Sequence, residues 1–316
     1  MEVMRIMANR KIYDAHVHIM PEHLLGAVDP LGISFDKFGV WTFDNKIKIQ
    51  RMPPYFENSC FSADALIAMM DAYGIEKANI MQSYMFRINE DIADAIAKYP
   101  GRIYGAMFID PRDKDVADQI TGWHNKGLNI IKLEMKGYTH PKAYPEIKLD
   151  SDTLMHVFDV AEKENLTITI DTDEVFGPGY QVEELKRAIT SHKSLRFVIC
   201  HFGFAQYVYL SDQRKMARWK EMLDLAKYEN VWIDISAMPD LFREERYPFP
   251  KCLQLFGEFV DKYGTSKAIW GSDMPGTFTT ATYTEMINMF EEAPNLSEEC
   301  KNHLFYDNAM AAYSCD

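Results

Sequence analysis

Short apolar runs alternate with amphipathic segments along most of this chain. We predict strands at residues 11–19, 77–82, 103–109, 129–135, 166–171, 196–201, 231–236 and 267–273. We predict one helix that begins near Ser62 and Asp64 and ends before Gly74, and further helices at residues 88–99, 113–125, 152–165, 182–192, 215–229, 250–263, 280–291 and 297–313. Short apolar strands that alternate with helices are typical of a parallel α/β sheet.

The number of strand–helix units selects the architecture. A closed (β/α)8 TIM barrel needs eight such units and uses roughly 250 residues, so a single domain over residues 1–316 has room for additional segments. The competing topology is an open doubly wound sheet, but no Gly-x-Gly-x-x-Gly motif follows the first strand to support its dinucleotide-binding version. We therefore predict an α/β TIM barrel with a long insertion after the first strand and an extra C-terminal helix.

The segment of about residues 20–61 interrupts the alternation. It has no clear periodicity and contains Pro21, Pro30, Pro53 and Pro54, with aromatic residues scattered between them. A loop of this length without regular structure is unusual inside a compact domain, and such loops are often lids or binding loops. The alternative is an excursion that packs on the barrel and covers it. The sequence supports both interpretations.

Composition excludes several classes of protein. An apolar content of 47% is ordinary for a globular protein, and a formal net charge of -13 argues against a broad nucleic-acid surface. The five cysteines are scattered and form no C-x-x-C, which suits reduced thiols in the cytoplasm rather than a disulfide framework. Residues 1–10 are too short and polar for a signal peptide, and no apolar run approaches about 18 residues. We expect a soluble cytoplasmic protein that contacts neither membranes nor nucleic acid.

The first predicted strand ends with two histidines, His16 and His18. Residues i and i+2 of a strand lie on the same face, so both imidazoles point the same way and can share one metal ion. Asp14 is on the same face and is expected either to contact His16 or to lie deeper in the barrel. For an isolated His-x-His, a pair of ordinary hydrogen-bonded histidines explains the pattern at least as well.

Other strand ends also carry side chains that suit a metal ion or acid–base chemistry. The carboxyl ends of barrel strands meet at one face, where the active sites of this fold lie. These strand ends supply Lys132, Glu134, Asp171, Asp173, His201 and Asp273. Asp234 ends the seventh strand, and the sequence leaves open whether it faces the site. Cys200 is expected on the opposite strand face, as buried packing. The combination of residues, rather than any one of them, predicts the site.

Three motifs resemble the amidohydrolase superfamily. They are Asp14-Ala15-His16-Val17-His18 on the first strand, Cys200-His201-Phe202-Gly203 on the sixth, and Trp270-Gly271-Ser272-Asp273-Met274-Pro275 on the eighth. They are most similar to the amidohydrolase-2 group, metal-dependent TIM-barrel enzymes that include aminocarboxymuconate-semialdehyde decarboxylase and dihydroxybenzoate decarboxylases. The ending Leu304-Phe305-Tyr306-Asp307-Asn308-Ala309 is similar to the closing helix of that group. Relatives are often dimers or larger, so the resemblance makes a homo-oligomer an expectation.

The resemblance implies a role for each matching residue. His16 and His18 would be metal ligands. Asp273 would be a further ligand and would accept a proton from the water that the metal activates. His201 would orient or polarise that water or the substrate, as a ligand or just outside the ligand shell. General chemistry agrees, because a divalent ion with an open coordination position lowers the pKa of bound water, and a nearby carboxylate can take the proton.

The fifth strand departs from the pattern of the group. Members usually carry a histidine ligand where this chain has Asp171. A carboxylate can also bind zinc, and the added anionic oxygen favours harder ions such as Mn²⁺. We expect one divalent ion, zinc first and manganese as the alternative. The candidate ligands are His16, His18, Asp171, His201 and Asp273. Alternatively, the metal is weakly bound or the catalytic ability has been lost.

Lys132 requires separate treatment. Some members of the superfamily carry a carboxylated lysine on the fourth strand that bridges two metal ions, but such sites normally use histidines on both the fifth and the sixth strand. One of those histidines is absent here, so we predict a single ion and assign Lys132 as a structural or substrate-binding cation. Glu134 and Asp173 are further candidates for binding the substrate.

Three functions remain open at this stage. The first is hydrolysis of an amide, lactone or ester bond in a small molecule, with Asp273 as general base and His201 as its catalytic partner. The second is non-oxidative decarboxylation of an aromatic or unsaturated carboxylic acid, which is a carbon–carbon lyase reaction at the same site. The third is a non-catalytic barrel that binds a ligand, an interpretation that rests on Asp171 alone.

Overall fold

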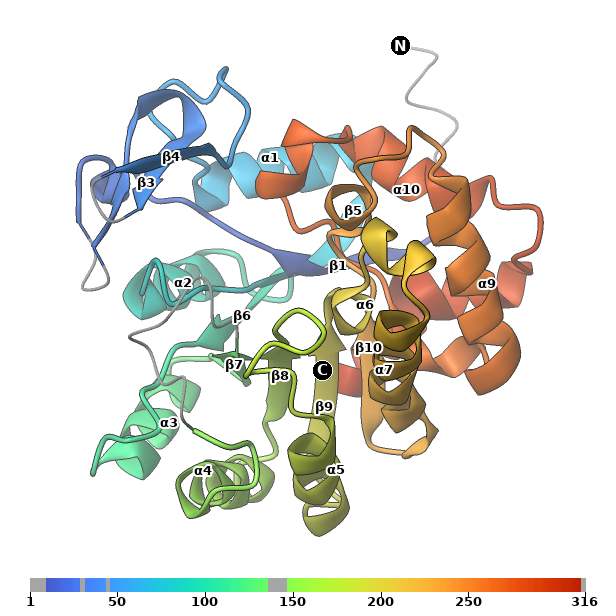
Figure 1. Ribbon diagram of the computed structural model, residues 1–316. Helices are drawn as coiled ribbons and strands as arrows, with labels where there is room; N and C mark the ends of the chain where they lie inside the picture. Colours follow the sequence, from blue (N-terminus) through green and yellow to red (C-terminus); the bar gives the residue numbers. More distant parts are fainter. Residues whose placement is uncertain (1–9, 29–31, 44–45, 136–146, 314–316) are drawn as a thin grey trace.

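The computed structural model describes residues 10–28, 32–43, 46–135 and 147–313. Its central feature is an eight-stranded sheet in the order β1-β5-β6-β7-β8-β9-β10-β11, which is also the order of these strands in the chain. Neighbouring strands are parallel, and the helices surround the sheet (Figure 1). The predicted (β/α)8 TIM barrel is confirmed.

The eight barrel strands coincide with the predicted ones. They are β1 (Ile12–Val17), β5 (Ile75–Ile80), β6 (Ile103–Met107), β7 (Ile130–Glu134), β8 (Thr167–Asp171), β9 (Arg196–Cys200), β10 (Val231–Asp234) and β11 (Ala268–Ile269). The last strand is shorter than predicted and pairs with β10 through Ala268 and Ile269 alone.

The helices also follow the prediction, with local differences. The α-helices are α1 (Ala63–Tyr73), α2 (Asn89–Lys98), α3 (Val116–His124), α4 (Asp152–Lys163), α5 (Val182–Ser191), α6 (His201–Phe204), α7 (Gln213–Leu223), α8 (Met238–Leu241), α9 (Pro250–Tyr263), α10 (Tyr283–Glu291), α11 (Glu298–Asn302) and α12 (Asn308–Tyr313). Short 3-10 turns are η2 (Glu22–Leu24), η3 (Lys37–Gly39), η4 (Tyr207–Ser211), η5 (Asp224–Lys227), η6 (Thr265–Lys267) and η7 (Gly276–Thr279). The predicted helix over 297–313 is divided by a π-helical turn, η8 (His303–Asp307). The four-residue helices α6 and α8 were not predicted.

The ends of α1 show how local sequence sets these boundaries. The Ser62 hydroxyl accepts a hydrogen bond from the backbone N–H of Ala65 at 3.1 Å, which satisfies one of the free amides of the first turn. The helix ends at Gly74, whose φ of 68° lies in the left-handed region that glycine adopts without steric cost. Both boundaries agree with the prediction from sequence.

Backbone hydrogen bonds join the first barrel strand to the segment that follows the last one. The N–H of Asp273 donates to the carbonyl of His16 at 2.7 Å, and the N–H of His18 donates to the carbonyl of Met274 at 2.8 Å. These bonds bring the two ends of the sheet together. The same bonds place Asp273 beside both histidines of β1.

A bulge in β1 decides which of its side chains enter the barrel. Asp14 pairs with Ala78 and Val17 pairs with Ile80, so three steps along β1 match only two steps along β5. The extra residue breaks the alternation of side chains between the two faces of the strand. Asp14 and His16 therefore do not share a face, which corrects the expectation drawn from regular spacing.

The hydrophobic core has two parts, one inside the barrel and one between the barrel and the helices. On β9, Val198 packs inside, whereas Phe197 and Ile199 pack against the surrounding helices. This is the period of two expected for a strand that is buried on both faces.

The C-terminal helix α12 contributes to the inner part of the core. Ala309, Ala312 and Tyr313 of α12 belong to the same buried cluster as Val198 and Ile130 of the barrel strands. The small side chains of the two alanines allow the helix to come close to the strands. The helix thus completes the interior packing.

The insertion after β1 contains regular structure that the sequence analysis did not predict. An antiparallel sheet is formed by β2 (Ile33–Phe35), β3 (Val40–Phe43) and β4 (Ile47–Gln50). It lies to one side of the barrel (Figure 1). All four residues of β4 are exposed, so its Ile-Lys-Ile-Gln alternation does not mark a buried face. This explains why hydrophobic periodicity failed to locate the sheet.

Two further expectations concern the whole chain. None of the helices in the described ranges is long and apolar enough to cross a membrane. Cys60, Cys200, Cys252 and Cys300 are free thiols, and Cys315 lies outside the described residues.

The packing of α12 gives a testable prediction. Ala312→Leu adds three carbons to a fully buried position and should lower the free energy of unfolding by about 1–3 kcal/mol. Ala311→Leu is the matched control, because Ala311 is exposed on the same helix and its substitution should change stability by less than about 0.5 kcal/mol. Chemical denaturation of both variants measures the difference. Equal stability of the two variants would show that α12 does not pack tightly on the barrel.

Candidate metal centre

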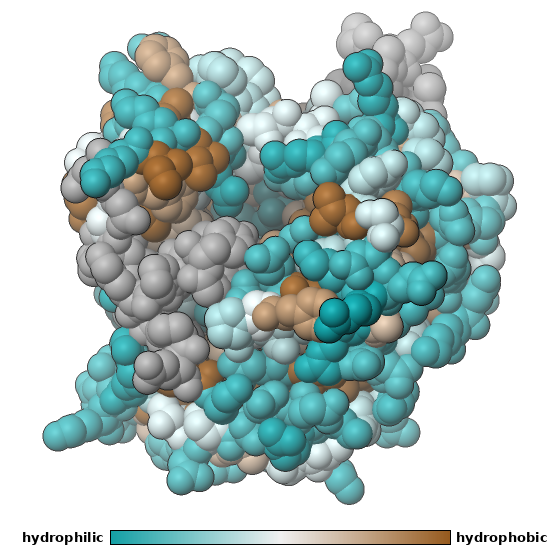
Figure 2. Space-filling model, viewed as in Figure 1, coloured by the Kyte–Doolittle hydropathy of each residue, from teal (hydrophilic) through white to brown (hydrophobic). Residues whose placement is uncertain are grey.

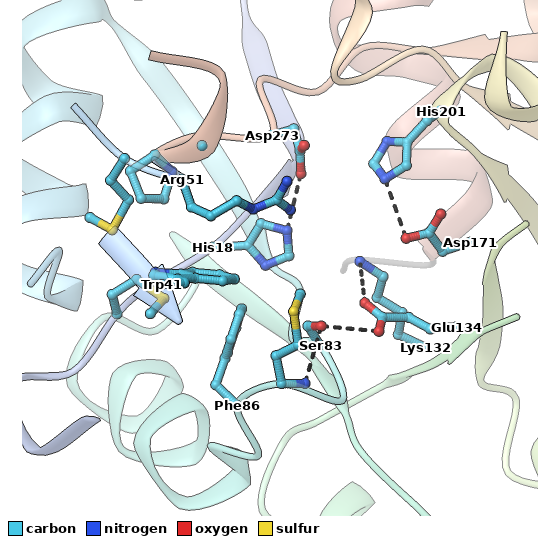
Figure 3. A pocket seen from close by; sticks show the side chains of 15 residues that line it. His18, Trp41, Arg51, Ser83, Phe86, Lys132, Glu134, Asp171, His201 and Asp273 are labelled. Atoms are coloured by element: carbon cyan, nitrogen blue, oxygen red, sulfur yellow. Dashed lines mark hydrogen bonds and ion pairs between the residues drawn. The ribbon is translucent and has the colours of Figure 1, made fainter. Parts of the chain in front are cut away.

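A cavity opens at the carboxyl ends of the barrel strands, with about 540 Å³ of empty space including its mouth. It corresponds to the hollow near the centre of the space-filling view (Figure 2). Part of its lining is polar and comes from strand ends: His18, Lys132, Glu134, Asp171, His201 and Asp273. Another part is apolar: Met20, Trp41, Met52, Met85 and Phe86 (Figure 3). Most of the predicted site residues therefore share one cavity.

His16 lies beneath this cavity and is completely buried. Its Nδ1 is 2.6 Å from the Asp234 carboxylate, and its Nε2 is 3.6 Å from Oδ1 of Asp273. Burial and the positive charge of Lys132 lower the pKa of His16 to about 4, although Asp234 acts in the opposite direction. The ring is therefore neutral near pH 7 and has a lone pair to offer.

His18 faces hydrogen-bond acceptors on both sides. Its Nδ1 is 2.8 Å from the carbonyl of Met81, and its Nε2 is 3.0 Å from Oδ1 of Asp273. A carbonyl only accepts, so Nδ1 must carry a proton, which leaves the Nε2 of a neutral ring with a lone pair directed at a carboxylate. This arrangement is favourable only with a cation at Nε2, either a second proton or a metal ion shared with Asp273.

Asp273 is held rigidly and carries a negative charge. Its φ of 56° is in the left-handed region, and its backbone N–H is bonded to β1. Burial alone would raise the pKa of Asp273, but the hydrogen bond with His18 and the electrostatic interactions with His201 and His18 hold that pKa well below its usual range. The carboxylate is therefore ionised throughout the neutral pH range.

His201 reaches the site through an unusual backbone turn. It follows β9 with a φ of 47°, and Phe202 and Gly203 also have positive φ values. The turn directs the His201 ring toward the site, where its Nδ1 contacts the Ser236 hydroxyl at 2.9 Å and its Nε2 lies 3.6 Å from Asp171. Asp171 thus stands on the wall where the fifth-strand ligand was predicted.

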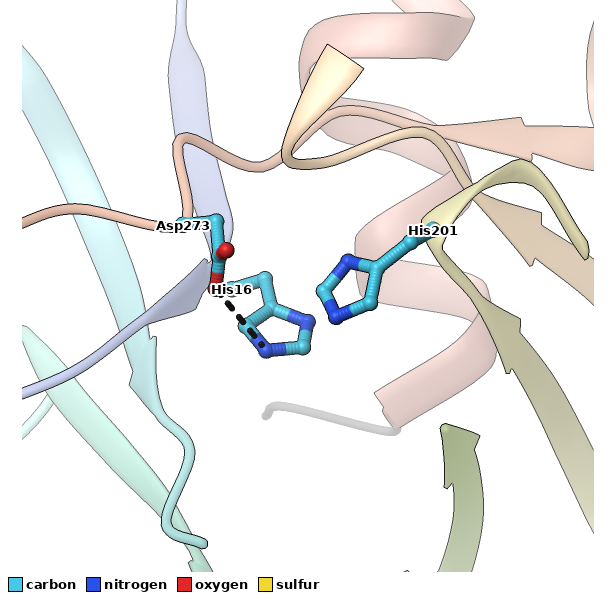
Figure 4. Close-up of side chains that lie close together, drawn as sticks. All are labelled: His16, His201 and Asp273. Carbon is cyan, nitrogen blue, oxygen red and sulfur yellow. Dashed lines mark ion pairs between the residues drawn. The ribbon is translucent and has the colours of Figure 1, made fainter. Parts of the chain in front are cut away.

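These residues fit a divalent metal ion. Ligand atoms of His16, His201 and Asp273 all lie within 4.8 Å of one another (Figure 4). Ligands that are each about 2.0–2.1 Å from one zinc ion lie roughly 3.3 Å apart in tetrahedral geometry. The separations of 3.0 Å and 3.6 Å between Asp273 Oδ1 and the Nε2 atoms of His18 and His16 bracket that value. The cation that the His18–Asp273 contact requires can be this ion.

Comparison with known proteins agrees with this chemistry. Residues 13–314 match a family model described as amidohydrolase. The chain belongs to the amidohydrolase family. The family is metal-dependent, so this amidohydrolase is an enzyme with a candidate metal site at the carboxyl ends of its barrel strands. No curated protein sequence matches the chain.

Several solved structures share the barrel of this amidohydrolase. A probable 2-pyrone-4,6-dicarboxylic acid hydrolase from Acinetobacter baumannii has a TM-score of 0.71 and 17% identity over 96% of this chain and 99% of that one. An amidohydrolase from Burkholderia multivorans has a TM-score of 0.73 and 16% identity over 96% and 99%. A 5-carboxyvanillate decarboxylase from Novosphingobium aromaticivorans has a TM-score of 0.55 and 19% identity over 79% of each chain. At these identities the likeness shows the common fold.

Lys132 and Glu134, from the end of β7, lie on the polar side of the amidohydrolase cavity. Lys132 Nζ is 3.1 Å from Nε2 of His16 and 3.9 Å from the Glu134 carboxylate, and both side chains are almost fully buried. Glu134 also accepts hydrogen bonds from the Ser83 hydroxyl at 3.0 Å and the Tyr84 N–H at 3.1 Å. The Lys132 ammonium therefore occupies the side of His16 that faces the metal site.

The carboxylate of Asp173 makes hydrogen bonds within its own loop. It accepts them from the backbone N–H groups of Glu174 at 2.9 Å and Gly179 at 3.2 Å. The described residues that line the cavity do not include it. Asp173 thus shapes the loop after β8.

Cys200 lies on a face that was not predicted, whereas Asp14 makes the predicted contact with His16, because its carboxylate accepts a hydrogen bond from the His16 backbone N–H at 3.3 Å. The Cys200 thiol is 3.8 Å from Nδ1 of His16, because it points into the barrel and the left-handed turn at His201 then brings the histidine to the same side. Burial raises the pKa of this thiol well above its usual value, so it is not a nucleophile. The Asp14 carboxylate accepts hydrogen bonds from the Ser272 N–H and hydroxyl and the Tyr283 hydroxyl, at 2.6–2.8 Å.

Some residues that shape the site were not predicted from the sequence. Ser236 contacts His201. The sequence feature that could have identified Ser236 is its position two residues after Asp234, at a strand end. Trp41 and Met52 reach the cavity from the insertion, for which a binding loop was one of the two interpretations, but no periodicity marked Met52.

The contact between Lys132 and His16 generates a prediction about metal affinity. An ammonium at 3.1 Å competes with a metal ion for the lone pair on Nε2 and repels it. Lys132→Met should therefore bind Zn²⁺ at least about tenfold more tightly than the wild type in a competition titration with a chromophoric chelator.

The control for this prediction is Lys126→Met, because Lys126 is a half-exposed lysine paired with Glu90 on the surface. Its affinity for Zn²⁺ should equal that of the wild type. Weaker binding by Lys132→Met would show that the lysine supports the metal site instead of competing with it.

Proposed function

We propose that this amidohydrolase hydrolyses an amide, lactone or ester bond of a small molecule with the help of one divalent metal ion. The observation that carries the proposal is the group of His16, His201 and Asp273, whose ligand atoms all lie within 4.8 Å of one another, with His18 3.0 Å from the Asp273 carboxylate. A buried cluster of two imidazoles and one carboxylate is a typical donor set for a catalytic metal with an open coordination position.

The proposed ligands are His16, His18 and Asp273, with Asp171 and His201 as the groups on the opposite wall that can complete the set. Zinc is the ion we propose, with manganese as the alternative because two carboxylates stand in the site. When bound, such an ion lowers the pKa of a water molecule and polarises a carbonyl group.

The protein side chains then control where the protons go. Asp273 is ionised and exposed to the cavity on one edge, so its carboxylate can take the proton from the attacking water. His201 is held by Ser236 through Nδ1, which turns Nε2 toward Asp171 and the cavity. From this position it can orient the water or polarise the carbonyl oxygen of the substrate.

The lining of the cavity suits a small molecule with a flat or apolar portion. Trp41 and Phe86 present aromatic rings with centroids 5.9 Å apart, beside three methionine side chains. Lys132 and Glu134 offer one charge of each sign on the opposite side, and we propose that they bind a polar group of the substrate.

Decarboxylation is the second candidate, because it uses the same ligands. The Acinetobacter baumannii hydrolase was solved with citric acid, and the Novosphingobium aromaticivorans decarboxylase with manganese and a nitrobenzoic acid. Sites on this barrel therefore accept carboxylic acids in both reaction classes. Assays must separate the two reactions.

We further propose that the enzyme works in the cytoplasm and uses no nucleic-acid or membrane partner. The separated free thiols suit a reducing compartment, and the net charge of -13 repels polyanions. A homo-oligomer remains an expectation from the family.

Metal content is the first test of the proposal. Protein grown or refolded with Zn²⁺ and Mn²⁺ should contain close to one equivalent of divalent ion by elemental analysis. A content below about a tenth of an equivalent under all conditions would exclude both enzyme mechanisms and favour the non-catalytic barrel.

Removal of the proposed base is the second test. Asp273→Asn should lower kcat at least about 100-fold, because the carboxamide cannot accept the proton. Circular dichroism and thermal unfolding should show an intact fold. Asp118→Asn is the control, since Asp118 is exposed on α3. Full activity of Asp273→Asn would refute the assignment of the base.

Substrate screening separates the two reaction classes. Lactones, amides and esters that carry a flat apolar group should be hydrolysed, with release of acid followed by a pH indicator. Hydroxybenzoates should release no carbon dioxide under the same conditions. Carbon dioxide release without hydrolysis of any lactone, amide or ester would replace the first candidate with the second.

A further inference from the structure

Strand β10 contributes none of the proposed ligands, yet the segment at its end contacts two histidines of the site. Asp234 is the last residue of β10, and Ser236 follows it by two positions. Asp234 contacts His16, and Ser236 contacts His201. Both Asp234 and Ser236 are fully buried. The residues at the end of β10 therefore hold two histidine rings of the site through side-chain contacts.

The contacts of His16 define which of its nitrogens carries the proton. Its Nδ1 is 2.6 Å from a carboxylate oxygen of Asp234, which can only accept, so Nδ1 carries the hydrogen. Its Nε2 is 3.1 Å from the Lys132 ammonium, which can only donate, so Nε2 carries the lone pair. Two independent partners thus select the same tautomer.

That tautomer is the one the site requires. Nε2 of His16 is the nitrogen near Oδ1 of Asp273, at 3.6 Å. A histidine can bind a metal only through a nitrogen with a free lone pair, and the partner of the other nitrogen fixes the tautomer and the orientation of the ring.

The Asp234 carboxylate is itself held in place. One oxygen faces His16, while the other accepts a hydrogen bond from the backbone N–H of Ser236 at 2.7 Å. The Cys200 thiol donates to the oxygen that faces His16, at 3.4 Å. The carboxylate therefore cannot turn away from His16 without leaving buried donors unsatisfied.

We propose that Asp234 is a positioning residue that fixes the tautomer of His16 and so prepares Nε2 for the metal. The proposal rests on the function proposed above and extends it to a residue that touches neither substrate nor metal. Partners of this kind typically account for a 10–100-fold difference in metal affinity.

The competing explanation is that Asp234, Cys200 and His16 form a second metal site of their own. These three buried residues also place ligand atoms within 4.8 Å of one another. However, the direct contact of 2.6 Å between Asp234 and His16 is shorter than the roughly 3.3 Å between two ligands of one tetrahedral ion.

The decisive substitution is Asp234→Asn. The Ser236 N–H still needs an acceptor, so the carboxamide oxygen should stay with it and the NH₂ group should face His16. An NH₂ group is a donor, which forces the proton of His16 onto Nε2 and removes the lone pair from the site. Affinity for Zn²⁺ should then fall 10–100-fold in a chelator competition titration.

Nitrogen NMR of ¹⁵N-histidine protein reports the tautomer directly, without metal and without activity. His16 is assigned by the signals that disappear in His16→Gln. In the wild-type protein we expect the proton on Nδ1, and in Asp234→Asn on Nε2. Cys200→Ser is the control and should change neither the tautomer nor the affinity for Zn²⁺ by more than about twofold.

Each result decides between the explanations. A wild-type proton on Nε2, or an unchanged tautomer in Asp234→Asn, would overturn the positioning role. A loss of affinity in Cys200→Ser as large as that in Asp234→Asn would assign both residues as ligands. If Asp234→Asn does not fold, the wild-type spectrum still tests the proposal. A wild-type protein with the expected tautomer that binds no metal would contradict the proposed function but not the positioning role.

Discussion

The site depends on the hydrogen bonds that join the beginning of the barrel to its end. The N–H of Asp273 binds the carbonyl of His16, and the N–H of His18 binds the carbonyl of Met274. Because backbone atoms make these bonds, they fix the backbone positions from which the Asp273 carboxylate and the two imidazoles project. A Cβ atom on Gly271 would lie 2.7 Å from Cβ of His16, so the close approach of the two segments also requires glycine at that position.

Around this junction, the protein gathers acidic and basic side chains that are largely buried. Asp273, Asp234, Asp171 and Glu134 face His16, His18, His201 and Lys132. Each buried charge would be costly alone, and the alternation of signs makes the group tolerable. The pKa values show the balance: burial and Lys132 keep His16 neutral, while the histidines keep Asp273 ionised. A divalent cation that binds among these residues would be attracted by the carboxylates and the neutral imidazoles and repelled by the Lys132 ammonium.

The sequence predicted the barrel and the identity of most site residues because both are encoded in simple periodic patterns. Eight apolar runs located the strands, and the polar residues at their ends fall in the cavity by topology alone.

The face on which a residue lies was harder to predict. The bulge in β1 put Asp14 and His16 on different faces, and the left-handed turn at His201 brought this histidine to the inner side that Cys200 also faces. A single extra residue in a strand moves the following side chains to the other face, and a positive φ redirects the chain locally; hydrophobic periodicity registers neither. Local sequence patterns also do not show which residues a side chain contacts in the folded protein. Asp173 binds its own loop, and Trp41 lines the cavity.

The junction between the ends of the barrel has a consequence for the order in which the enzyme is assembled. His18 and Asp273 are 255 positions apart in the chain, and α12, which completes the interior packing, lies later still. During synthesis the first histidines leave the ribosome long before their carboxylate partner exists. The metal-binding donors can come together only when nearly the whole chain is available, so a contact of such long range forms late in folding. Partially made chains therefore carry the His-x-His pair without the geometry that would let it act.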